Sequence, residues 1–576
     1  MTLYFGCDNS FILKNNYLFF IVFFLSLVSS IDNNCYAQAG INSEFEHQKA
    51  NIFLSQANQE SLTAPSSTPL NKVDPQASIK IDTITVSGST IFPQEDFKTI
   101  IQPLEGKISS LSELRLVADQ ITQLYLQDGY ITSRAVINSD SLAEGNIQIE
   151  IIEGEIEEIK IIGADKLIKY VRSRVNLGAA SPLNTRKLEE QLRLLRTDPL
   201  IENIEANLSA GSGIGRSTLI VRVKAAKPLA LDFGIDNYSP PSVGSERLGL
   251  ELAYRNLSGL GDTFSTSYFP RIEAFSDTFD LNFQYQVPIN PKNGTITAEI
   301  ELNRNEIVNG IGEDFDINGE TELYRLNYRQ PIIRSTKQEV ALSLGFDYQD
   351  SQTFLQEDGF SFIAGPEKGA SKTSVLRFGQ DYILRQPKGA WAFASSLNLG
   401  IDLFDATTNS SESVPDGKFF SWLGQIQRVQ VLNKDNFLII QSEFQLTPDS
   451  LLPSQQFIIG GGQSVKGYRQ NTRSGDNGFL FSIEDRFTVS RSTAGQPIFT
   501  LAPFFNMGAI WNADDNPNER PNQNFLAALG LGFIWQPISD LNIRLDYAPP
   551  LIDLDDRGDN VQDDGFHFSV RYSKKI

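Results

Sequence analysis

The feature that most restricts the fold of this chain is a two-residue alternation of polar and apolar side chains, which runs from residue 228 to the C-terminus. It comes in segments of about ten residues, separated by turns rich in Gly, Asn, Asp and Pro. In TITAEIELN, residues 295–303, isoleucine, alanine and leucine alternate with threonine, glutamate and asparagine. Because successive side chains of a strand point to opposite faces, each segment predicts a β-strand with one apolar and one polar face.

The number and length of these segments indicate a closed barrel. Sixteen segments can be counted, and an antiparallel barrel with both ends on one side needs an even number. A soluble β-sandwich is the alternative, but the run is too long for one sandwich core and the second face carries ionised Glu, Arg and Asp. In a barrel that spans a membrane, lipid on the outside would suit the apolar face and water on the inside would suit the polar face. We therefore expect residues 228–576 to form a sixteen-stranded antiparallel transmembrane β-barrel.

The sequence before the barrel predicts a tandem repeat of a small α+β unit. Residues 78–154 and residues 155–227 each show a strand, two amphipathic helices and two further strands, in the order β-α-α-β-β. Gly88 and Gly163 each follow the first strand of a copy, and they are 163 − 88 = 75 residues apart. We expect two stacked soluble units, because a single copy of this size has a small core.

The N-terminal 39 residues have the features of an export signal. Lys14 precedes the apolar run YLFFIVFFLSLVSS, and small residues follow in CYAQA, residues 35–39. A retained membrane anchor is the alternative, although the run is short for a spanning helix. Residues 40–77 are a polar, helix-prone piece followed by a linker rich in Pro and Ser, which is either a disordered tail or a short functional helix.

The composition argues against several classes of function. Lys and Arg total 49 against 70 for Asp and Glu, and the net charge of −21 disfavours a surface that binds nucleic acid. His47 and His567 are the only histidines, and Cys7 and Cys35 both lie in the expected signal peptide. We therefore expect no metal site, no cofactor and no catalytic residues, and we do not expect an enzyme.

One glycine-dense stretch interrupts the strand pattern between the eleventh and twelfth segments. It reads GGGQSVKGYRQ, residues 460–470, and carries one cation, Lys466, and one aromatic side chain, Tyr468. Glycine lets the backbone reverse sharply in little space. The stretch is either an ordinary surface loop or a hairpin that doubles back inside the barrel, where Lys466 and Tyr468 would hold it.

This order of elements resembles the two-partner secretion transporters (TpsB), the haemolysin secretion/activation proteins of ShlB/FhaC/HecB type in the BamA/TpsB outer-membrane superfamily. GYITSRAVI and LAEGNIQIEIIEGEIEEI are similar to the first POTRA (polypeptide-transport-associated) domain of that family. SVKGY is similar to its V-R-G-Y/F motif and FFNMG to its F-x-D-x-G motif. The matching positions of these two motifs are Val465, Lys466, Gly467 and Tyr468 in the loop, and Phe504, Asn506 and Gly508 in a strand.

The resemblance implies that a loop of about residues 447–476 folds into the lumen, where the family's arginine pairs with its aspartate on the barrel wall. Here those positions hold Lys466 and Asn506, so that charge pair cannot form. We expect Lys466 either to pair with another carboxylate or to contact Asn506, whose side chain can still accept a hydrogen bond.

Strand parity identifies a candidate carboxylate. In FTLAPFFNMGAIW the odd positions are apolar, so Phe504, Asn506 and Gly508 should face the lumen. In the preceding strand the same count turns Glu484 inward together with Arg486. It turns Asp485 outward, which fits only near a membrane interface or at a β-bulge.

The resemblance also implies a function. It predicts export across an outer membrane of a large β-helical exoprotein, such as a haemolysin or a filamentous adhesin, by a monomer in contact with lipid. The N-terminal units would lie in the periplasm and bind the chain in transit by strand addition. Residues 41–60 would be a candidate pore plug. A barrel-assembly insertase and a passive porin with a periplasmic arm are the alternative functions.

Overall fold

The computed structural model describes residues 2–3, 78–309, 315–409, 414–518 and 520–576. The described chain forms two compact units, which divide between Ala226 and Lys227. Residues 4–77 hold nearly all of the expected signal peptide and the whole of the candidate plug, so these two expectations lie outside the described residues. Each unit is treated on its own below.

The N-terminal unit begins with a three-stranded sheet covered by two helices. A capping box starts the second helix: the Ser110 hydroxyl accepts the N–H of Glu113, and the Glu113 carboxylate accepts the N–H of Ser110. Gly129, with φ of 91°, ends it. The elements are β2 (Ser78–Lys80), β3 (Thr83–Ser87), α3 (Gln94–Ile101), β4 (Ile108–Ser110), α4 (Leu111–Gln127), β5 (Arg134–Ile137), a 3-10 turn (Ser139–Ala143) and β6 (Asn146–Ile152), with sheet order β3-β6-β5.

The same unit continues with a second copy of this arrangement. Its elements are β7 (Glu155–Ile162), a 3-10 turn (Asp165–Leu167), α5 (Ile168–Val175), α6 (Thr185–Arg196), β8 (Ile201–Ala210) and β9 (Arg216–Ala225). The sheet order β7-β9-β8 matches that of the first copy, and β1 (Thr2–Leu3) pairs with the outer edge of β8. In both copies the first strand runs parallel to the last, β3 to β6 and β7 to β9.

Gly88 and Gly163 occupy equivalent positions in the two copies. Their φ angles are 84° and 82°, a region that favours glycine. A Cβ at Gly88 would lie 2.4 Å from the carbonyl oxygen of Ile151, and one at Gly163 would lie 2.4 Å from that of Val223. Each glycine therefore lets the chain leave the first strand close against the last strand. The 75-residue spacing seen in the sequence reflects this shared geometry.

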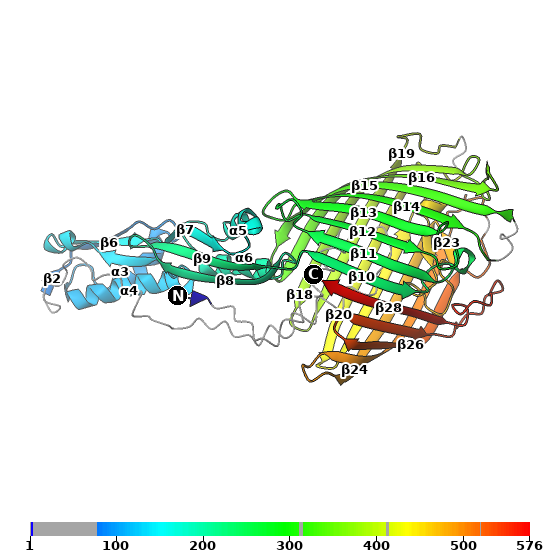
Figure 1. Ribbon diagram of the computed structural model, residues 1–576. Coiled ribbons are helices and arrows are strands. Elements are labelled where there is room, and N and C mark those ends of the chain that lie inside the picture. The colour runs from blue at the N-terminus through cyan, green and yellow to red at the C-terminus, as the bar shows by residue number, and fades with distance from the viewer. Residues whose placement is uncertain (1, 4–77, 310–314, 410–413, 519) are drawn as a thin grey trace. The chain divides into compact units, whose positions relative to one another are not determined.

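The second unit is the expected sixteen-stranded antiparallel barrel (Figure 1). A two-residue strand, β17 (Asp358–Gly359), adds only to the end of β16. The sixteen are β10 (Leu229–Asp236), β11 (Arg247–Arg255), β12 (Thr263–Pro270), β13 (Phe279–Pro288), β14 (Thr295–Glu306), β15 (Ile317–Arg334), β16 (Gln338–Leu355), β18 (Ala370–Gln386), β19 (Gly389–Ile401), β20 (Phe420–Asn433), β21 (Asn436–Leu446), β24 (Asn477–Arg491), β25 (Pro497–Trp511), β26 (Phe525–Ile538), β27 (Leu541–Tyr547) and β28 (Phe566–Lys575).

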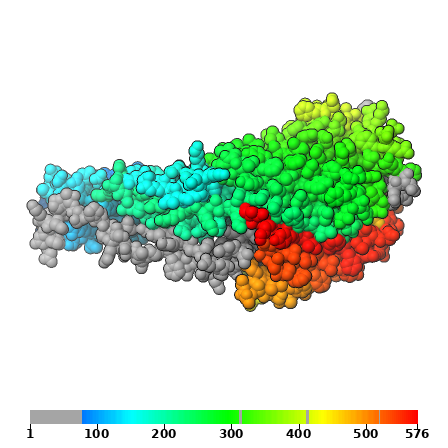
Figure 2. Space-filling view, viewed as in Figure 1, coloured from blue at the N-terminus to red at the C-terminus, as the bar shows by residue number. Residues whose placement is uncertain are grey.

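The barrel closes where its first and last strands pair. β10 and β28 run antiparallel from the pair of Ala230 and Lys575 to the pair of Asp236 and Ser569. Figures 1 and 2 show this seam as the contact between the green start and the red end of the barrel. Since β10 starts and β28 finishes at one end of the barrel, the loops 237–246, 447–476 and 548–565 lie at the other end, which is called the mouth below.

The two faces of the barrel wall differ as the alternation predicts. In β14 the lumen-facing Thr297 and Glu299 are buried, whereas the intervening Ala298 and Ile300 are exposed on the outside. Other large apolar side chains exposed on the outer wall include Phe233, Leu326, Leu344, Phe378 and Leu529. An outer surface of this kind suits the hydrocarbon of a membrane.

The lumen wall carries a set of ion pairs between its strands. Arg325 lies 3.2 Å from Glu299, Arg329 lies 2.9 Å from Asp381, and Arg377 lies 2.5 Å from Asp347. These pairs link strands β14, β15, β16 and β18 on the inner face. The inside is therefore polar and suited to water.

Asp485, for which alternation predicts an outward side chain, lies in the middle of β24. It is the register partner of Leu438, two residues after the start of β21, and the amide of Asn436 lies 3.4 Å from its carboxylate. A β-bulge follows between Thr488 and Ser490. The register is regular at Asp485 itself, so its outward carboxylate does not sit at a bulge.

Candidate functional site: the pore loop and the lumen wall

The loop between β21 and β24 folds back into the barrel as a hairpin. Its short strands β22 (Phe457–Ile459) and β23 (Arg473–Gly475) pair antiparallel, after a 3-10 turn at Pro453–Gln455. The segment 460–472 forms the tip. Most of the tip is buried, including Val465, Lys466 and Tyr468. The glycine-dense stretch is therefore an internal hairpin, called the pore loop below, and is not an ordinary surface loop.

Glycines allow the pore loop to turn and to approach the wall. Gly460, Gly461 and Gly467 have φ angles of 108°, 104° and 96°, where other residues are strained. On the facing strand β25, a Cβ at Gly508 would lie 3.2 Å from both Ile459 Cδ1 and Val465 Cγ2. The glycine of the FFNMG motif thus makes room for the loop.

Apolar contacts hold the pore loop against strands β25 and β26. Val465 is fully buried in a cluster with Ile459 and Tyr468 from the loop. The wall side of the cluster is made by Phe504, Ile510, Leu526, Ala528 and Ala548. Burial of such side chains supplies non-directional stabilisation, and the polar contacts described next fix the position of the loop.

Lys466 lies between two residues that face each other across strands β24 and β25. Its Nζ donates to Glu484 Oε2 at 3.1 Å and stands 4.0 Å from the centre of the Phe504 ring. Glu484 and Phe504 are register partners. Lys466 is 2% exposed, so its ammonium is stabilised by the carboxylate and by the face of the ring in place of water.

Glu484 also binds two arginines, so the lysine and the glutamate do not form an isolated pair. Arg486 Nε donates to Oε1 at 2.5 Å, and Arg544 Nη2 donates to Oε2 at 2.7 Å. Arg544 in turn binds Asp546 through Nε and Nη2, at 2.7 and 2.9 Å, and Lys466 lies 3.9 Å from Asp546. These five residues, called the lumen charge cluster, contain three cations and two carboxylates, which leaves 3 − 2 = +1.

Asn506 lies beside the lumen charge cluster without joining it. Its Nδ2 donates to the hydroxyl of its register partner Ser482 at 2.6 Å. Within the described chain its Oδ1 accepts no hydrogen bond, although Asn506 is 1% exposed. The sequence suggested two partners for Lys466. In the structure Glu484 accepts a hydrogen bond from the Lys466 ammonium, whereas Asn506 is hydrogen-bonded to Ser482.

Tyr468 binds the loop to the mouth end of β26 and to the loop after β27. Its hydroxyl donates to the carbonyl oxygen of Ala527 at 2.8 Å and accepts the N–H of Ile552 at 3.2 Å. Gly467 packs beside it, with its N–H 3.4 Å from His567 Nε2. The four motif residues therefore have different contacts: Val465 packs in the apolar cluster, Lys466 pairs with Glu484, Gly467 has the positive φ of the turn, and Tyr468 is hydrogen-bonded to β26 and to the loop after β27.

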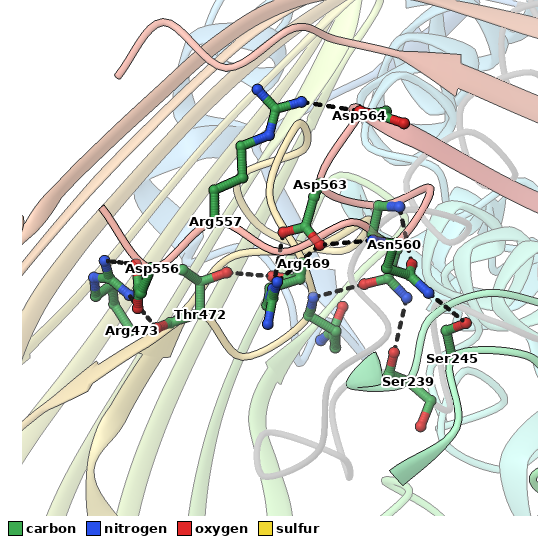
Figure 3. Close-up of polar contacts among 12 residues, drawn as sticks. Ser239, Ser245, Arg469, Thr472, Arg473, Asp556, Arg557, Asn560, Asp563 and Asp564 are labelled. Atoms are coloured by element: carbon green, nitrogen blue, oxygen red, sulfur yellow. Dashed lines mark hydrogen bonds and ion pairs between the residues drawn. The ribbon is translucent and has the colours of Figure 1, made fainter. Parts of the chain in front are cut away.

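The arginines that follow the motif bind the loop between β27 and β28 (Figure 3). Arg469 forms two hydrogen bonds with Asp563, both of 2.8 Å, and Arg473 forms two with Asp556, of 2.9 and 2.8 Å. The hydrogen bonds from Arg473 hold the pKa of the Asp556 carboxyl below its usual value. That pair is therefore charged on both sides at neutral pH, with the planar fork geometry that arginine offers.

Comparison with known proteins decides what kind of molecule carries this site. The family described as haemolysin secretion/activation protein ShlB/FhaC/HecB matches residues 215–534, which is more than half of the chain. The ShlB-type POTRA domain matches residues 79–154. The chain belongs to the ShlB/FhaC/HecB family.

Similar curated proteins are outer-membrane and haemolysin transporters. The outer membrane transporter CdiB of Escherichia coli is 23% identical over 69% of this chain and 67% of its own length. The hemolysin transporter protein ShlB of Serratia marcescens is 23% identical over 81% of each chain. The heme/hemopexin transporter protein HuxB of Haemophilus influenzae is 21% identical over 81% of this chain and 82% of its own.

Solved structures show the same fold. CdiB from Escherichia coli superposes with a TM-score of 0.65 at 20% identity, covering 89% of this chain and 93% of that one. CdiB from Acinetobacter baumannii superposes with a TM-score of 0.60 at 17% identity, covering 99% and 100%. BamA from Haemophilus ducreyi, lacking POTRA domains 1–3, gives 0.51 at 14% identity, covering 86% and 100%.

The protein is therefore an outer-membrane transporter of the two-partner secretion type, with a POTRA domain in the periplasm. The family match favours this function over the insertase and the porin that the sequence left open. The mouth of this ShlB/FhaC/HecB transporter is its extracellular end, because the POTRA side of the chain enters the barrel at the opposite end.

Sequence reasoning missed part of the site of this transporter. Arg544 and Asp546 were not singled out, although both alternate with apolar residues in LNIRLDY and so face the lumen. That alternation was the available signal. Arg469 and Arg473 were also missed, together with their acidic partners Asp563 and Asp556, because those partners lie in an irregular loop where no periodic pattern applies.

Proposed function

We propose that this transporter exports one large β-helical exoprotein, such as a haemolysin or a filamentous adhesin, in an unfolded state through the barrel. The observation that carries the proposal is the polar lumen wall, on which arginines pair with carboxylates across strands β14 to β18. An extended chain has unsatisfied backbone groups that need a hydrated or hydrogen-bonding path. A charged, water-compatible wall supplies such a path, and an apolar one would not.

The N-terminal unit is proposed to recognise and bind the exoprotein. We propose that residues 78–154 and 155–227 are both POTRA domains, since the second copy has the strand order and the glycine position of the first. The sheet orders leave β3 and β5 at the edges of the first sheet and β7 at one edge of the second. A strand edge has unpaired N–H and C=O groups, which an extended exoprotein segment can pair with.

The pore loop is proposed to obstruct the lumen while it is packed against the barrel wall. Val465, Lys466, Gly467 and Tyr468 hold it against the wall residues Glu484, Phe504, Asn506 and Gly508. Passage of a polypeptide requires this loop to shift. The loop is held by hydrogen bonds, ion pairs and side-chain packing, all of which can break and form again.

The remaining parts of the proposal concern the surroundings of the barrel. The apolar outer wall would contact outer-membrane lipid, and the closed seam lets one chain work as a monomer. Among the described residues, no group of three or more His, Cys, Asp or Glu side chains could hold a metal ion. We propose transport without a catalytic step, a cofactor or a nucleic-acid partner.

A binding experiment tests the recognition step. The fragment 79–225 contains two complete apolar cores, so it should be folded by circular dichroism when purified. It should bind the N-terminal region of a large secreted β-helical protein from the same genome, measured by calorimetry. The N-terminal region of an unrelated secreted protein is the control. A folded fragment that binds neither would rule out exoprotein recognition by this unit.

A further inference from the structure

Gln562, just before β28, joins three segments of the chain at the mouth. Its Oε1 accepts the N–H of Gln470 in the pore loop at 2.8 Å. Its Nε2 donates to the carbonyl oxygens of Asn237 and Ser239, both at 2.8 Å. Gln562 is 0% exposed, and both of its amide hydrogens and its oxygen are used.

The segment 237–239 that Gln562 binds is the continuation of the barrel seam. Asn237 follows β10 directly, and its Nδ2 donates to Phe566 O at 3.0 Å while its Oδ1 accepts the N–H of Phe568 at 2.8 Å. Asn237 thus extends the β10–β28 ladder with its side chain. Gln562 binds the backbone of the same segment from the other side, so the mouth end of the seam is completed by two buried amides.

The pore loop is attached to the same short element. Arg469 pairs with Asp563, the neighbour of Gln562 in sequence, and Asn560 Nδ2 donates to Ser245 Oγ at 3.2 Å in the loop after β10 (Figure 3). Residues 560–563 therefore hold the pore loop on one side and the first strand on the other. A displacement of either side must change the contacts of this element.

We infer that Gln562 is a positioning residue that couples the seating of the pore loop to the closure of the β10–β28 seam. When the loop leaves the lumen, Gln562 Oε1 loses its hydrogen bond from Gln470. Residues 560–563, which bind segment 237–239, then lose their contacts with the pore loop. Unseating the loop therefore loosens the mouth end of the seam. This coupling is internal to the barrel and does not depend on which protein is exported.

Hydrogen exchange of the full-length protein in lipid nanodiscs tests the inference. Gln562→Leu removes two buried hydrogen bonds to segment 237–239 and one to the pore loop. It should raise amide exchange in β10 and β28 by at least about tenfold and leave β15 and β16 unchanged. Asn398→Leu is the matched control. Asn398 is also buried and its side-chain amide also forms three hydrogen bonds, with Arg377, Ser396 and Ser421 on β18, β19 and β20, but it contacts neither the pore loop nor the seam. Asn398→Leu should leave β10 and β28 as in the wild type.

A second comparison separates coupling from a merely structural role. Lys466→Ala, which loosens the pore loop, should raise exchange at the seam in the wild-type background. In the Gln562→Leu background it should add little, because the connection is already lost. An equal increment in both backgrounds, or no change at the seam in Gln562→Leu, would overturn the inference.

A milder variant covers the case in which Gln562→Leu does not insert. Gln562→Glu keeps an oxygen for Gln470 and loses the two hydrogens given to Asn237 and Ser239. It should loosen the seam as Gln562→Leu does, while the loop stays protected from trypsin at Lys466. A protected seam in Gln562→Glu would count against the assignment.

Discussion

Arg544 and Lys466 share one carboxylate oxygen. Arg544 Nη2 lies 2.7 Å and Lys466 Nζ lies 3.1 Å from Oε2 of Glu484, while Arg486 binds the other oxygen. Glu484 is thus the centre of the lumen charge cluster, and Lys466 is one of three cations around it. The two members of the loop-to-wall pair are therefore unequal, and their substitution should have unequal effects.

Glu484→Gln should damage the barrel more than Lys466→Met. Without its charge, the lumen charge cluster would hold three buried cations and one carboxylate, Asp546, and breaking a buried ion pair costs on the order of 3–5 kcal/mol. Without the lysine, Glu484 keeps Arg486 and Arg544, so we expect a loss of about 1–2 kcal/mol together with a less firmly seated loop. Gel-shift melting of the folded barrel gives the stabilities, and secretion of the partner gives the activity. Equal losses in both variants would contradict this asymmetry.

Asn506→Asp should be tolerated. The lumen charge cluster carries one excess positive charge, and the asparagine has a buried oxygen without a donor in the described chain. An aspartate there would place a negative charge beside it, and the Ser482 hydroxyl can rotate to donate. We expect unchanged secretion and partial recovery of stability in the Glu484→Gln background. Asn506→Leu, which has no charge and no donor, is the control and should recover nothing. Recovery by leucine as well would show that the charge is irrelevant.

Strand parity was enough to place one side of the site. Glu484, Phe504, Asn506 and Gly508 lie on adjacent strands, β24 and β25, whose pairing follows from a short turn. A period of two then decides which side chains face the lumen. The barrel itself could be predicted for the same reason, because each strand carries its own pattern.

The rest of the site depends on distances between side chains of different strands and loops, which the alternation within one strand does not give. Arg544 and Asp546 lie on β27, three strands from β24, and reach Glu484 because the closed wall curves and its strands are tilted. Alternation shows that Arg544 faces inward, but it gives no distance across the lumen. The contacts of Arg469 and Gln562 lie between irregular loops, where the backbone path decides every partner.

Asn184→Ala should loosen the joint between the two copies of the N-terminal unit. Asn184 caps α6 by accepting the N–H groups of Arg186 and Lys187, and its Nδ2 donates to Asp128 O at the end of α4 at 2.9 Å. We expect a loss of about 1 kcal/mol from the cap. Hydrogen exchange should rise at the end of α4 and at the start of α6 together.

Asn138→Ala provides the comparison for this joint. Asn138 caps the 3-10 turn at Ser139–Ala143 within the first copy, by accepting the N–H of Asp140 at 3.0 Å. Its loss should raise exchange only near that turn. If Asn184→Ala affected α6 and left the end of α4 unchanged, Asn184 would be a helix cap and nothing more.

Gly467→Ala should unseat the pore loop, and Gly495→Ala should not. Both glycines have positive φ, 96° and 79°, so both substitutions carry the backbone cost of about 1–2 kcal/mol for a left-handed residue. A Cβ at Gly467 would also lie 2.5 Å from Ala548 O, whereas one at Gly495, in the turn after β24, would meet nothing within 4 Å. The difference between the variants therefore measures the effect of the collision alone.

Trypsin added to intact cells should cleave after Lys466, Arg469 or Arg473 faster in Gly467→Ala than in the wild type, and secretion should fall. Gly495→Ala should be cleaved and should secrete as the wild type does. If the two variants behaved alike, close packing at Gly467 would have no part in holding the loop.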